Sequence, residues 1–342
     1  MRQRSRQSIK LDDVAGQAGV SPSTVSLYIR QPGRVSDKTG KKIQAAIDSL
    51  GYVPNKIASQ FTGSGSSIMA VVLPSLANIT FGHVIQCIES TVSAHGYQLA
   101  IASHDHCLEK EEAQIRAILQ WSPAAIAIAG ADHRPATLKM LQASGVPVVQ
   151  MWQVDGSAFQ AQVGNNQEQI GYAAAQYLLE SGCKNLGYFT TRFADDIRAR
   201  IRYTGFCRAL AEQGKTPLLA DIPETGNIWQ ASREYLMKTL VKTRGLDGIF
   251  CTSDAIGTAL LMEAQARGIR VPEQLSILGF GDFPSSAWLA PASLSSISLN
   301  ADLIASRTAD MMLRMSREES YRGEVVDVGF EIMPRNSTRL PF

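Results

Sequence analysis

The sequence predicts an all-α N-terminal headpiece followed by an α/β core of two doubly wound parallel-sheet lobes. Two observations predict this arrangement. In the first sixty residues, apolar side chains recur at helical spacing and turn signals separate short helices. After residue 67, short apolar runs alternate with amphipathic stretches in two series, which favours parallel sheets covered on both faces. The chain has 342 residues, of which 45% are hydrophobic, so it can bury the cores of two or three domains.

Two short helices joined by a tight turn are predicted between residues 11 and 30. Gly19 stands where a helix C-terminus favours a residue that tolerates a left-handed backbone. Ser21 then caps a second helix, and Pro22 occupies its first turn, where a missing N–H costs nothing. The apolar face of the first helix is formed by Leu11, Val14, Ala15 and Ala18.

The second helix of this pair has one face that can be buried and one that cannot. Val20, Val25 and Ile29 can pack against the first helix. This is the geometry of a helix-turn-helix, whose second helix enters the major groove of DNA. The side chains left facing outward are Pro22, Ser23, Ser26, Leu27 and Arg30.

A third amphipathic helix begins after Ser36, which is a suitable cap, and ends at Gly51. One further helix is predicted for residues 54–62, and it is too short to be stable alone in water. Residues 63–67 have the composition of a flexible linker. The apolar stripe of the third helix is Ile43, Ala46, Ile47 and Leu50.

The positive charge of the chain gathers at this end. Residues 1–63 hold ten Lys or Arg and four Asp, a net charge of +6, whereas the whole chain carries +2. A basic segment that coincides with a helix-turn-helix pattern predicts a phosphate-binding surface. The five cysteines are scattered singly and are expected to be reduced. Neither a secretory signal nor a membrane span is visible, so a cytoplasmic protein is expected.

The core elements follow from the alternation of apolar runs. In the first series the expected strands are 68–73, 98–102, 124–129 and 146–150, and the expected helices are 81–94, 110–120 and 136–144. In the second series the expected helices are 167–181, 201–213, 229–243 and 255–267, and the expected strands are 186–189, 248–251 and 275–279.

The N-terminal motifs resemble those of the LacI/GalR family of transcription regulators. They are Asp13-Val14-Ala15, Ala18-Gly19-Val20-Ser21, Thr24-Val25-Ser26 and Gly51-Tyr52-Val53-Pro54-Asn55, in the family's usual order. A narrower resemblance to the gluconate-repressor branch rests on Leu73-Pro74-Ser75-Leu76, Ile88-Glu89-Ser90, Ala94-His95-Gly96-Tyr97, Thr137-Leu138-Lys139-Met140 and Gly145-Val146-Pro147-Val148-Val149.

The resemblance implies a domain organisation. Residues 1–53 would form the helix-turn-helix domain, residues 54–67 the hinge helix and linker, and residues 68–342 a periplasmic-binding-protein-like core for effector binding and dimerisation. The chain of such a core crosses between lobes three times, here near residues 165, 295 and 325. The N-lobe would comprise about 68–165 and 296–325, and the C-lobe about 166–295 and 326–342.

The effector site is expected in the cleft between the lobes, because ligands of parallel sheets bind at the carboxyl ends of the strands. The resemblance implies that Arg202, three residues before a glycine at the start of a helix, holds effector oxygens with its planar fork. Arg198 and Arg200 are then surface or supporting residues. The other candidates follow strand ends: Ser75, Thr80, Phe81, Trp152, Ser253 and Asp282.

Ordinary packing is an alternative for some of these residues. Phe81 and Trp152 can equally be core residues, and Trp229 fits packing somewhat better than the cleft. Many relatives have Asn where Ser253 stands and Asp where Gly281 stands, and Asp282 could replace the latter.

The DNA-binding residues implied by the resemblance include two departures from relatives. Leu27 stands where an arginine often reads guanine, and it can only make apolar contacts, for example with a thymine methyl. Phe61 stands where a leucine usually wedges into the central minor-groove step. The implied set is Ser21, Pro22, Ser23, Ser26, Leu27 and Arg30 in the headpiece and Asn55, Lys56, Ala58 and Phe61 in the hinge.

The function that these features predict is a repressor of transcription. A homodimer would bind a near-palindromic double-stranded DNA operator, and a small effector would release it; co-repression by the effector is the alternative to this induction. A sugar acid such as gluconate or 2-ketogluconate is the expected effector, and a neutral sugar or a sugar phosphate is the alternative. No heptad repeat that would predict a tetramer is visible near Pro341.

Other function classes fit less well. A solute-binding protein of transport would have a signal peptide and no helix-turn-helix. An enzyme would show a nucleotide loop or a catalytic motif, and none is present, so no cofactor is expected. His104-Asp105-His106-Cys107 suggests a metal, but such adjacent residues rarely converge on one ion, so a polar loop and no metal site are expected.

Overall fold

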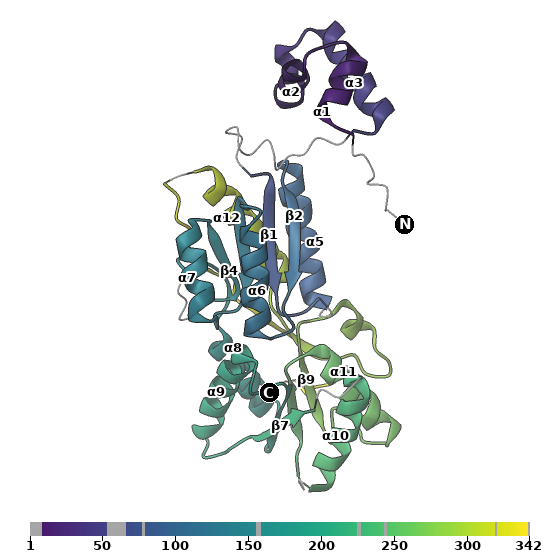
Figure 1. Ribbon diagram of the computed structural model, residues 1–342. Coiled ribbons are helices and arrows are strands. Elements are labelled where there is room, and N and C mark those ends of the chain that lie inside the picture. Colours follow the sequence, from purple (N-terminus) through teal and green to yellow (C-terminus); the bar gives the residue numbers. More distant parts are fainter. Residues whose placement is uncertain are drawn as a thin grey trace, which may run out of the picture. The chain divides into compact units, whose positions relative to one another are not determined.

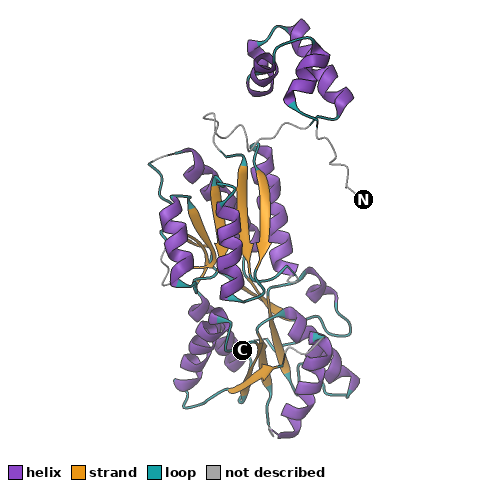
Figure 2. Ribbon diagram, viewed as in Figure 1, coloured by secondary structure: helices purple, strands orange, loops and turns teal. Residues whose placement is uncertain are grey.

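The computed structural model describes residues 9–52, 66–76, 79–154, 159–223, 227–242, 245–318 and 320–340. The chain divides into two compact units, Met1–Gly65 and Ser66–Phe342 (Figure 1). The first unit is helical and the second is built from helices and two sheets (Figure 2). Within the described ranges, no helix combines the length and apolarity needed to cross a membrane.

The first unit packs three helices around a small core. They are α1 (Leu11–Ala18), α2 (Pro22–Arg30) and α3 (Asp37–Leu50), with a 3-10 turn, η1 (Pro32–Arg34), between the last two. Val14, Val25 and Ile43, one from each helix, are fully buried at its centre. The predicted helix-turn-helix is therefore confirmed in its described part.

The predicted capping signals also operate as expected. Gly19 ends α1 with a left-handed backbone, φ 67°. The Ser21 hydroxyl accepts a hydrogen bond from the backbone N–H of Thr24 at 3.2 Å, and Pro22 is the first residue of α2. Ser36 caps α3 in the same manner. The helix expected at residues 54–62 lies outside the described residues.

The first sheet of the core is parallel throughout. Its strands lie in the order β11-β5-β4-β3-β1-β2. Helices α5 (Ile79–Ala94) and α12 (Ala301–Arg317) pack together on one face, and α6 (Leu108–Leu119) and α7 (Pro135–Ser144) pack on the other (Figure 1). The strands are β1 (Ile68–Leu73), β2 (Gln98–Ser103), β3 (Ala125–Ala129), β4 (Val148–Gln153), β5 (Ala161–Asn165) and β11 (Val325–Asp327).

The second sheet has the order β12-β10-β9-β8-β6-β7 and is parallel except for β12, which pairs antiparallel with β10 at the edge. Helices α8 (Gln167–Glu180) and α9 (Ile197–Ala211) cover one face, and α10 (Ile228–Lys242) and α11 (Asp254–Ala266) cover the other. The strands are β6 (Leu186–Thr191), β7 (Leu218–Ile222), β8 (Gly248–Cys251), β9 (Ser276–Phe280), β10 (Ser295–Ser298) and β12 (Glu331–Met333).

Burial on both faces explains why the strands read as continuous apolar runs. Val71 and Val72 are both fully buried, but Val71 packs in the α5 and α12 layer and Val72 in the α6 and α7 layer. Tyr188 and Phe189 divide in the same way between the two layers of the second sheet. The alternation of side chains along each strand therefore feeds two separate packing layers.

The chain passes between the lobes at three places, and one side chain ties them together. Asn165, at the first crossing, is fully buried and its amide donates to the carbonyl oxygens of Leu299, at 3.2 Å, and of Gly329. These two residues belong to the second and third crossings. The Asn300 amide adds a bond to the carbonyl oxygen of Val328 at 3.0 Å.

The crossings differ in place from the expectation. β10 belongs to the second sheet, so the chain crosses at residues 299–300, after this strand and not near 295. β11 belongs to the first sheet, so the third crossing follows residue 327. In addition, no strand was predicted at β5, β7, β10, β11 or β12, and no helix was predicted at α12. These strands have three to five residues each, too few for a clear apolar run.

Candidate functional site

The recognition helix of the headpiece leaves a small polar surface exposed. Ser21, Pro22 and Ser23 are exposed, Ser26 and Leu27 are half-buried, and Val25 is fully buried beneath them. The expected outward face of α2 is thus exposed at its start and partly covered at Ser26 and Leu27. The Arg30 side chain lies outside the described part of the structure, and so do the hinge residues Asn55, Lys56, Ala58 and Phe61.

The basic residues of the headpiece are exposed as well. Arg34 lies in η1, and Lys38, Lys41 and Lys42 lie in the first turns of α3, all of them accessible. Cations presented on one short stretch of chain next to the recognition helix are suited to phosphate contacts.

The core contains a cavity of about 420 Å³ at the carboxyl ends of the strands of both sheets. A cavity of this size and position is typical of a small-molecule site. Six of the seven predicted effector residues line it: Ser75, Thr80, Phe81, Trp152, Arg202 and Ser253.

Asp282 does not line the cavity. Its carboxylate accepts a hydrogen bond from the Arg335 guanidinium at 2.6 Å, and its backbone N–H donates to the Ser296 hydroxyl at 3.0 Å. Asp282 has a left-handed backbone, φ 48°, and this turn directs it to the loop that precedes the end of the chain. The assignment of Asp282 to the site is therefore corrected.

Arg202 is a buried cation at the cavity wall. It is 4% exposed, its guanidinium carbon lies 4.3 Å from the centre of the Phe280 ring, and Nη1 donates to the Gln167 side-chain oxygen at 2.5 Å. Its Nε has no hydrogen-bond partner among the described residues. A buried guanidinium N–H without a partner is costly, which points to an acceptor supplied from outside the protein. Arg202 lies in the second turn of α9, not at its start, because α9 begins at Ile197.

Two glycines allow α9 to approach α8 closely enough to place Arg202. A Cβ on Gly205 would lie 1.9 Å from the carbonyl oxygen of Glu168, and one on Gly171 would lie 1.7 Å from that of Arg202. No side chain fits at either position while the backbones stay in place. The glycine three residues after Arg202 is therefore required by the packing of these two helices.

Trp152 forms the opposite wall and is linked to Arg202. The Gln167 amide that accepts from Arg202 donates in turn to the carbonyl oxygen of Trp152 at 2.8 Å. The Trp152 ring packs edge-on against Phe81 with centroids 5.1 Å apart, and its indole N–H has no partner within the described residues. Trp152 lies inside β4, which extends to Gln153 and beyond the expected end at residue 150.

A charged pair at the start of α9 was not predicted from the sequence. The Asp196 carboxylate caps this helix by accepting from the backbone N–H of Arg198 at 3.0 Å, and Arg198 Nε lies 3.7 Å from Oδ1 of Asp196. Burial alone would raise the pKa of Asp196, but Arg198 and Arg202 hold that pKa below its ordinary value. Arg198 lines the cavity itself, whereas a surface or supporting position was expected for it. The signal was readable, because residues 198 and 202 share one face of a helix.

Further lining residues come from both lobes. Trp229 lines the cavity and is 42% exposed, so the expectation that it packs in the core is corrected. His106, Gln167, Thr191, Arg192 and Thr252 were not proposed and also line it.

Comparisons with known proteins agree with this architecture. The profile of the lacI family of bacterial regulatory proteins matches residues 10–55, and that of a periplasmic binding protein-like domain matches residues 175–338. The HTH-type transcriptional regulator GntR of Pseudomonas aeruginosa is 33% identical over 329 residues, 96% of this chain and 95% of that protein. GntR of Escherichia coli K12 is 30% identical over 334 residues, 96% of this chain and 98% of that protein.

A solved structure gives the same result over the whole chain. A LacI-family transcriptional regulator from Silicibacter pomeroyi superposes with a TM-score of 0.89 at 30% identity, covering 96% of this chain and 99% of that one. These proteins are named as regulators of transcription and not as enzymes. The chain therefore belongs to the LacI family of bacterial regulatory proteins and is a DNA-binding transcriptional repressor.

Proposed function

We propose that the effector of this repressor is a sugar acid of the gluconate type, bound in the cleft with its carboxylate on Arg202. The observation that carries the proposal is Nε of Arg202, which is buried at the wall of a cavity of suitable size and has no hydrogen-bond partner among the described residues. The planar fork of arginine suits a carboxylate, which can accept two parallel N–H bonds.

The charges around the cavity support an anionic ligand. Arg192, Arg198 and Arg202 line it, while Asp196 is its only lining carboxylate among the described residues. The resemblance to the gluconate-repressor branch points to the same ligand class. Hydroxyl groups of such a ligand would bind Ser75, Thr252 or Ser253, which follow strands, or Thr80 in the first turn of α5.

The same geometry supports control of DNA binding by the ligand. Gln167 connects Arg202 in the second lobe with Trp152 in the first, so a ligand that engages these residues bears on both lobes at once. We infer that the ligand stabilises one relative orientation of the lobes and thereby weakens operator binding. This coupling must be reciprocal, so bound operator DNA should lower the affinity of the protein for the ligand by the same factor.

Calorimetric titration with gluconate, 2-ketogluconate, glucose and gluconate 6-phosphate tests the ligand class. For the acid that binds wild type, Arg202→Ala should weaken affinity by roughly ten- to 150-fold, because charge-assisted bonds contribute about 1.5–3 kcal/mol. Arg208→Ala is the matched control, since Arg208 lies on the same helix, is 51% exposed and pairs with Glu168.

A mobility-shift assay must accompany the titration. Operator binding by Arg202→Ala should remain normal but should no longer respond to the acid. Unchanged affinity for the acid in this variant would exclude the role of Arg202. If glucose or gluconate 6-phosphate bound more tightly than the sugar acids, the effector would instead be a neutral sugar or a sugar phosphate.

We further propose that α2 reads the operator through Ser21, Pro22, Ser23, Ser26, Leu27 and Arg30, with the hinge residues Asn55, Lys56, Ala58 and Phe61 in the minor groove. The exposed face of α2 and the accessible lysines of α3 support this. Lys41→Gln should weaken binding to all DNA sequences and reduce the slope of log affinity against log salt concentration by about 0.9.

Leu27→Ala should lower the affinity for the operator but not that for random DNA. Equal effects of Leu27→Ala on operator and random DNA would contradict this assignment.

A homodimer is the proposed assembly, because it presents two recognition helices to the two halves of a symmetric operator. Sedimentation at micromolar concentration should give a dimer. A stable tetramer under these conditions would contradict the proposal.

A further inference from the structure

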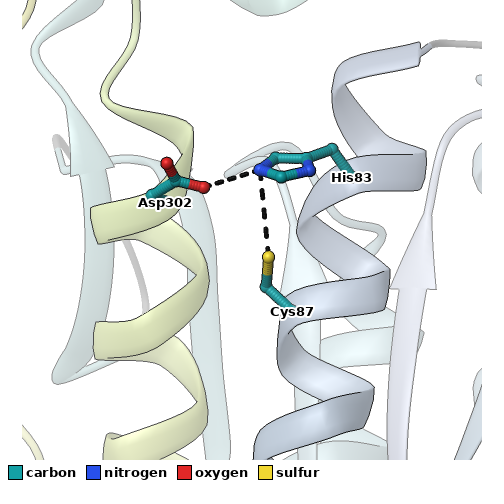
Figure 3. Close-up of side chains that lie close together, drawn as sticks. All are labelled: His83, Cys87 and Asp302. Atoms are coloured by element: carbon teal, nitrogen blue, oxygen red, sulfur yellow. Dashed lines mark hydrogen bonds and ion pairs between the residues drawn. The ribbon is translucent and has the colours of Figure 1, made fainter.

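Three potential metal ligands converge where α5 meets α12, outside the cavity. His83 and Cys87 lie four residues apart on α5 and therefore share one face of it, and Asp302 projects from the first turn of α12 (Figure 3). Nε2 of His83 lies 2.6 Å from Oδ1 of Asp302 and 3.8 Å from Sγ of Cys87. The three donor atoms all lie within 4.8 Å of one another.

The arrangement is not that of a catalytic relay. In a Cys-His-Asp relay, one ring nitrogen faces the nucleophile and the other faces the carboxylate. Here the same nitrogen, Nε2 of His83, faces both Cys87 and Asp302 (Figure 3). One nitrogen cannot exchange a proton with one group while it is oriented by the other. Three donors that point to one centre are instead the geometry of a metal site.

We propose that His83, Cys87 and Asp302 bind a zinc-class divalent ion, with the fourth position open to solvent. Thiolate and imidazole ligands favour Zn²⁺ over the oxygen-seeking Mg²⁺ and Ca²⁺. Zinc bonds of about 2.0–2.3 Å at tetrahedral angles place ligand atoms roughly 3.3–3.6 Å apart. The nitrogen–sulfur distance is therefore close to that of an occupied site, and the nitrogen–oxygen distance must lengthen by less than an ångström.

The side chains can make this adjustment without disturbing the core. The Asp302 side chain is 84% exposed and that of His83 is 52% exposed, so both can rotate and an ion can reach them from solvent. Cys87 is half-buried on the side of α5 that faces α12, and it anchors the site. The packing of α5 against α12 brings Asp302 to His83 across 219 residues of sequence.

The site lies next to the effector cavity without being part of it. The first turn of α5 supplies Ile79, Thr80 and Phe81 to the cavity wall, and α12 begins two residues after Leu299, which also lines the cavity. An ion that joins the two helices would hold together two segments of this wall. Metal binding would thus stiffen the first lobe beside the proposed ligand.

The test is a titration of the untagged, reduced, full-length protein with Co²⁺ and Zn²⁺. One Co²⁺ per chain should bind and give a thiolate-to-cobalt charge-transfer band in the near ultraviolet, which Zn²⁺ should abolish. Cys87→Ser should lose the band. Loss of a residue that only hydrogen-bonds to a metal ligand typically lowers metal affinity by about 10- to 100-fold. His83→Gln and Asp302→Asn remove ligands themselves, so each should lower the affinity for Zn²⁺ by more than that.

Cys107→Ser is the matched control, because Cys107 is also half-buried and lies 3.4 Å from a carboxylate, that of Glu109. This variant should keep the band. Thermal unfolding without metal should show that all variants fold. The proposal is overturned if wild type gives no band, if Cys87→Ser retains it, or if Asp302→Asn binds Zn²⁺ like wild type. The last outcome would leave His83 and Asp302 as an exposed ion pair only.

Discussion

The two walls of the cavity differ in chemistry. The first lobe forms an aromatic wall of apolar and hydroxyl side chains such as Phe81, Trp152 and Thr80. The second lobe forms a charged wall, because it supplies the three arginines and the aspartate in addition to the rings of Trp229 and Phe280. Hydrogen bonds of Gln167 to Arg202 and to the carbonyl oxygen of Trp152 join the aromatic wall to the charged wall. The charged wall is thus suited to select the class of ligand, and the aromatic wall is suited to report its presence to the lobe that follows the headpiece in sequence.

The largest effect is expected from the backbone contact that positions the charged wall. Gly205→Ala should destabilise the core by at least about 1–3 kcal/mol, since its Cβ would meet the backbone of α8, not a flexible side chain. Gly82→Ala is the control, because Gly82 lies in α5 with nothing within 4 Å of the added carbon, and alanine favours a helix. Urea unfolding measures both, and equal stability of the two variants would show that α9 can move away from α8 freely.

A smaller effect is expected at the aromatic wall. Trp152→Phe keeps an aromatic ring but removes the indole N–H that has no partner within the described residues. Ligand affinity should fall by about 0.5–1.5 kcal/mol, the value of one hydrogen bond. The loss should be similar for acid and neutral ligands, whereas Arg202→Ala should penalise acids alone. Calorimetry that finds Trp152→Phe selective against acids would contradict the division of roles between the walls.

The smallest effect concerns pH and separates the lobes again. Burial lowers the pKa of His104, next to the first-lobe wall, against the opposing effect of Glu111 at 3.6 Å, while His106, His133 and Arg198 lower it further. The folded state therefore binds fewer protons than the unfolded state, so stability should rise with pH up to about 6.5 and fall on acidification. In the second lobe, the lowered pKa of Asp196 means that its ionised carboxylate stabilises the fold at neutral pH. This stabilisation is lost only as the pH falls through the range in which carboxyl groups become protonated.

His104→Gln should flatten the pH dependence of unfolding between about pH 5 and 7. Denaturant midpoints across this range measure it, with His95→Gln as a control at an exposed histidine. The same slope in His104→Gln and wild type would exclude His104 as the titrating group.

Local signals predicted well wherever one short segment decides the structure. Gly19, Ser21 and Ser36 mark the helix ends of the headpiece because a cap depends only on its own turn. The cavity residues that follow strand ends were predictable for a similar reason. Parallel strands place their carboxyl ends at one edge, so Ser75 and Ser253 could be assigned from the apolar runs before them.

Long-range contacts were not predictable from these signals. Asp282 follows a strand like the other candidates, but Arg335, 53 residues later, removes it from the site. The convergence of His83 with Asp302 depends on α12, whose helix was missed although Ile304, Thr308 and Met312 recur at helical spacing. Arg198 could have been found from its spacing to Arg202 on one helical face.

The amide of Asn165 gives the core a pivot. Because this side chain lies on one crossing and bonds the backbone of the other two, a turn of the lobes centred on it would keep these bonds, whereas drawing the lobes apart would break them. β1 runs from Ile68, where the linker enters, to Leu73 near the cavity, a length of roughly 20 Å. A turn of about 10° around the pivot would move the far end of such a lever by ~3.5 Å, comparable to the rise of one residue in a strand. A slight turn of the lobes would thus displace the start of β1 by about the length of one residue.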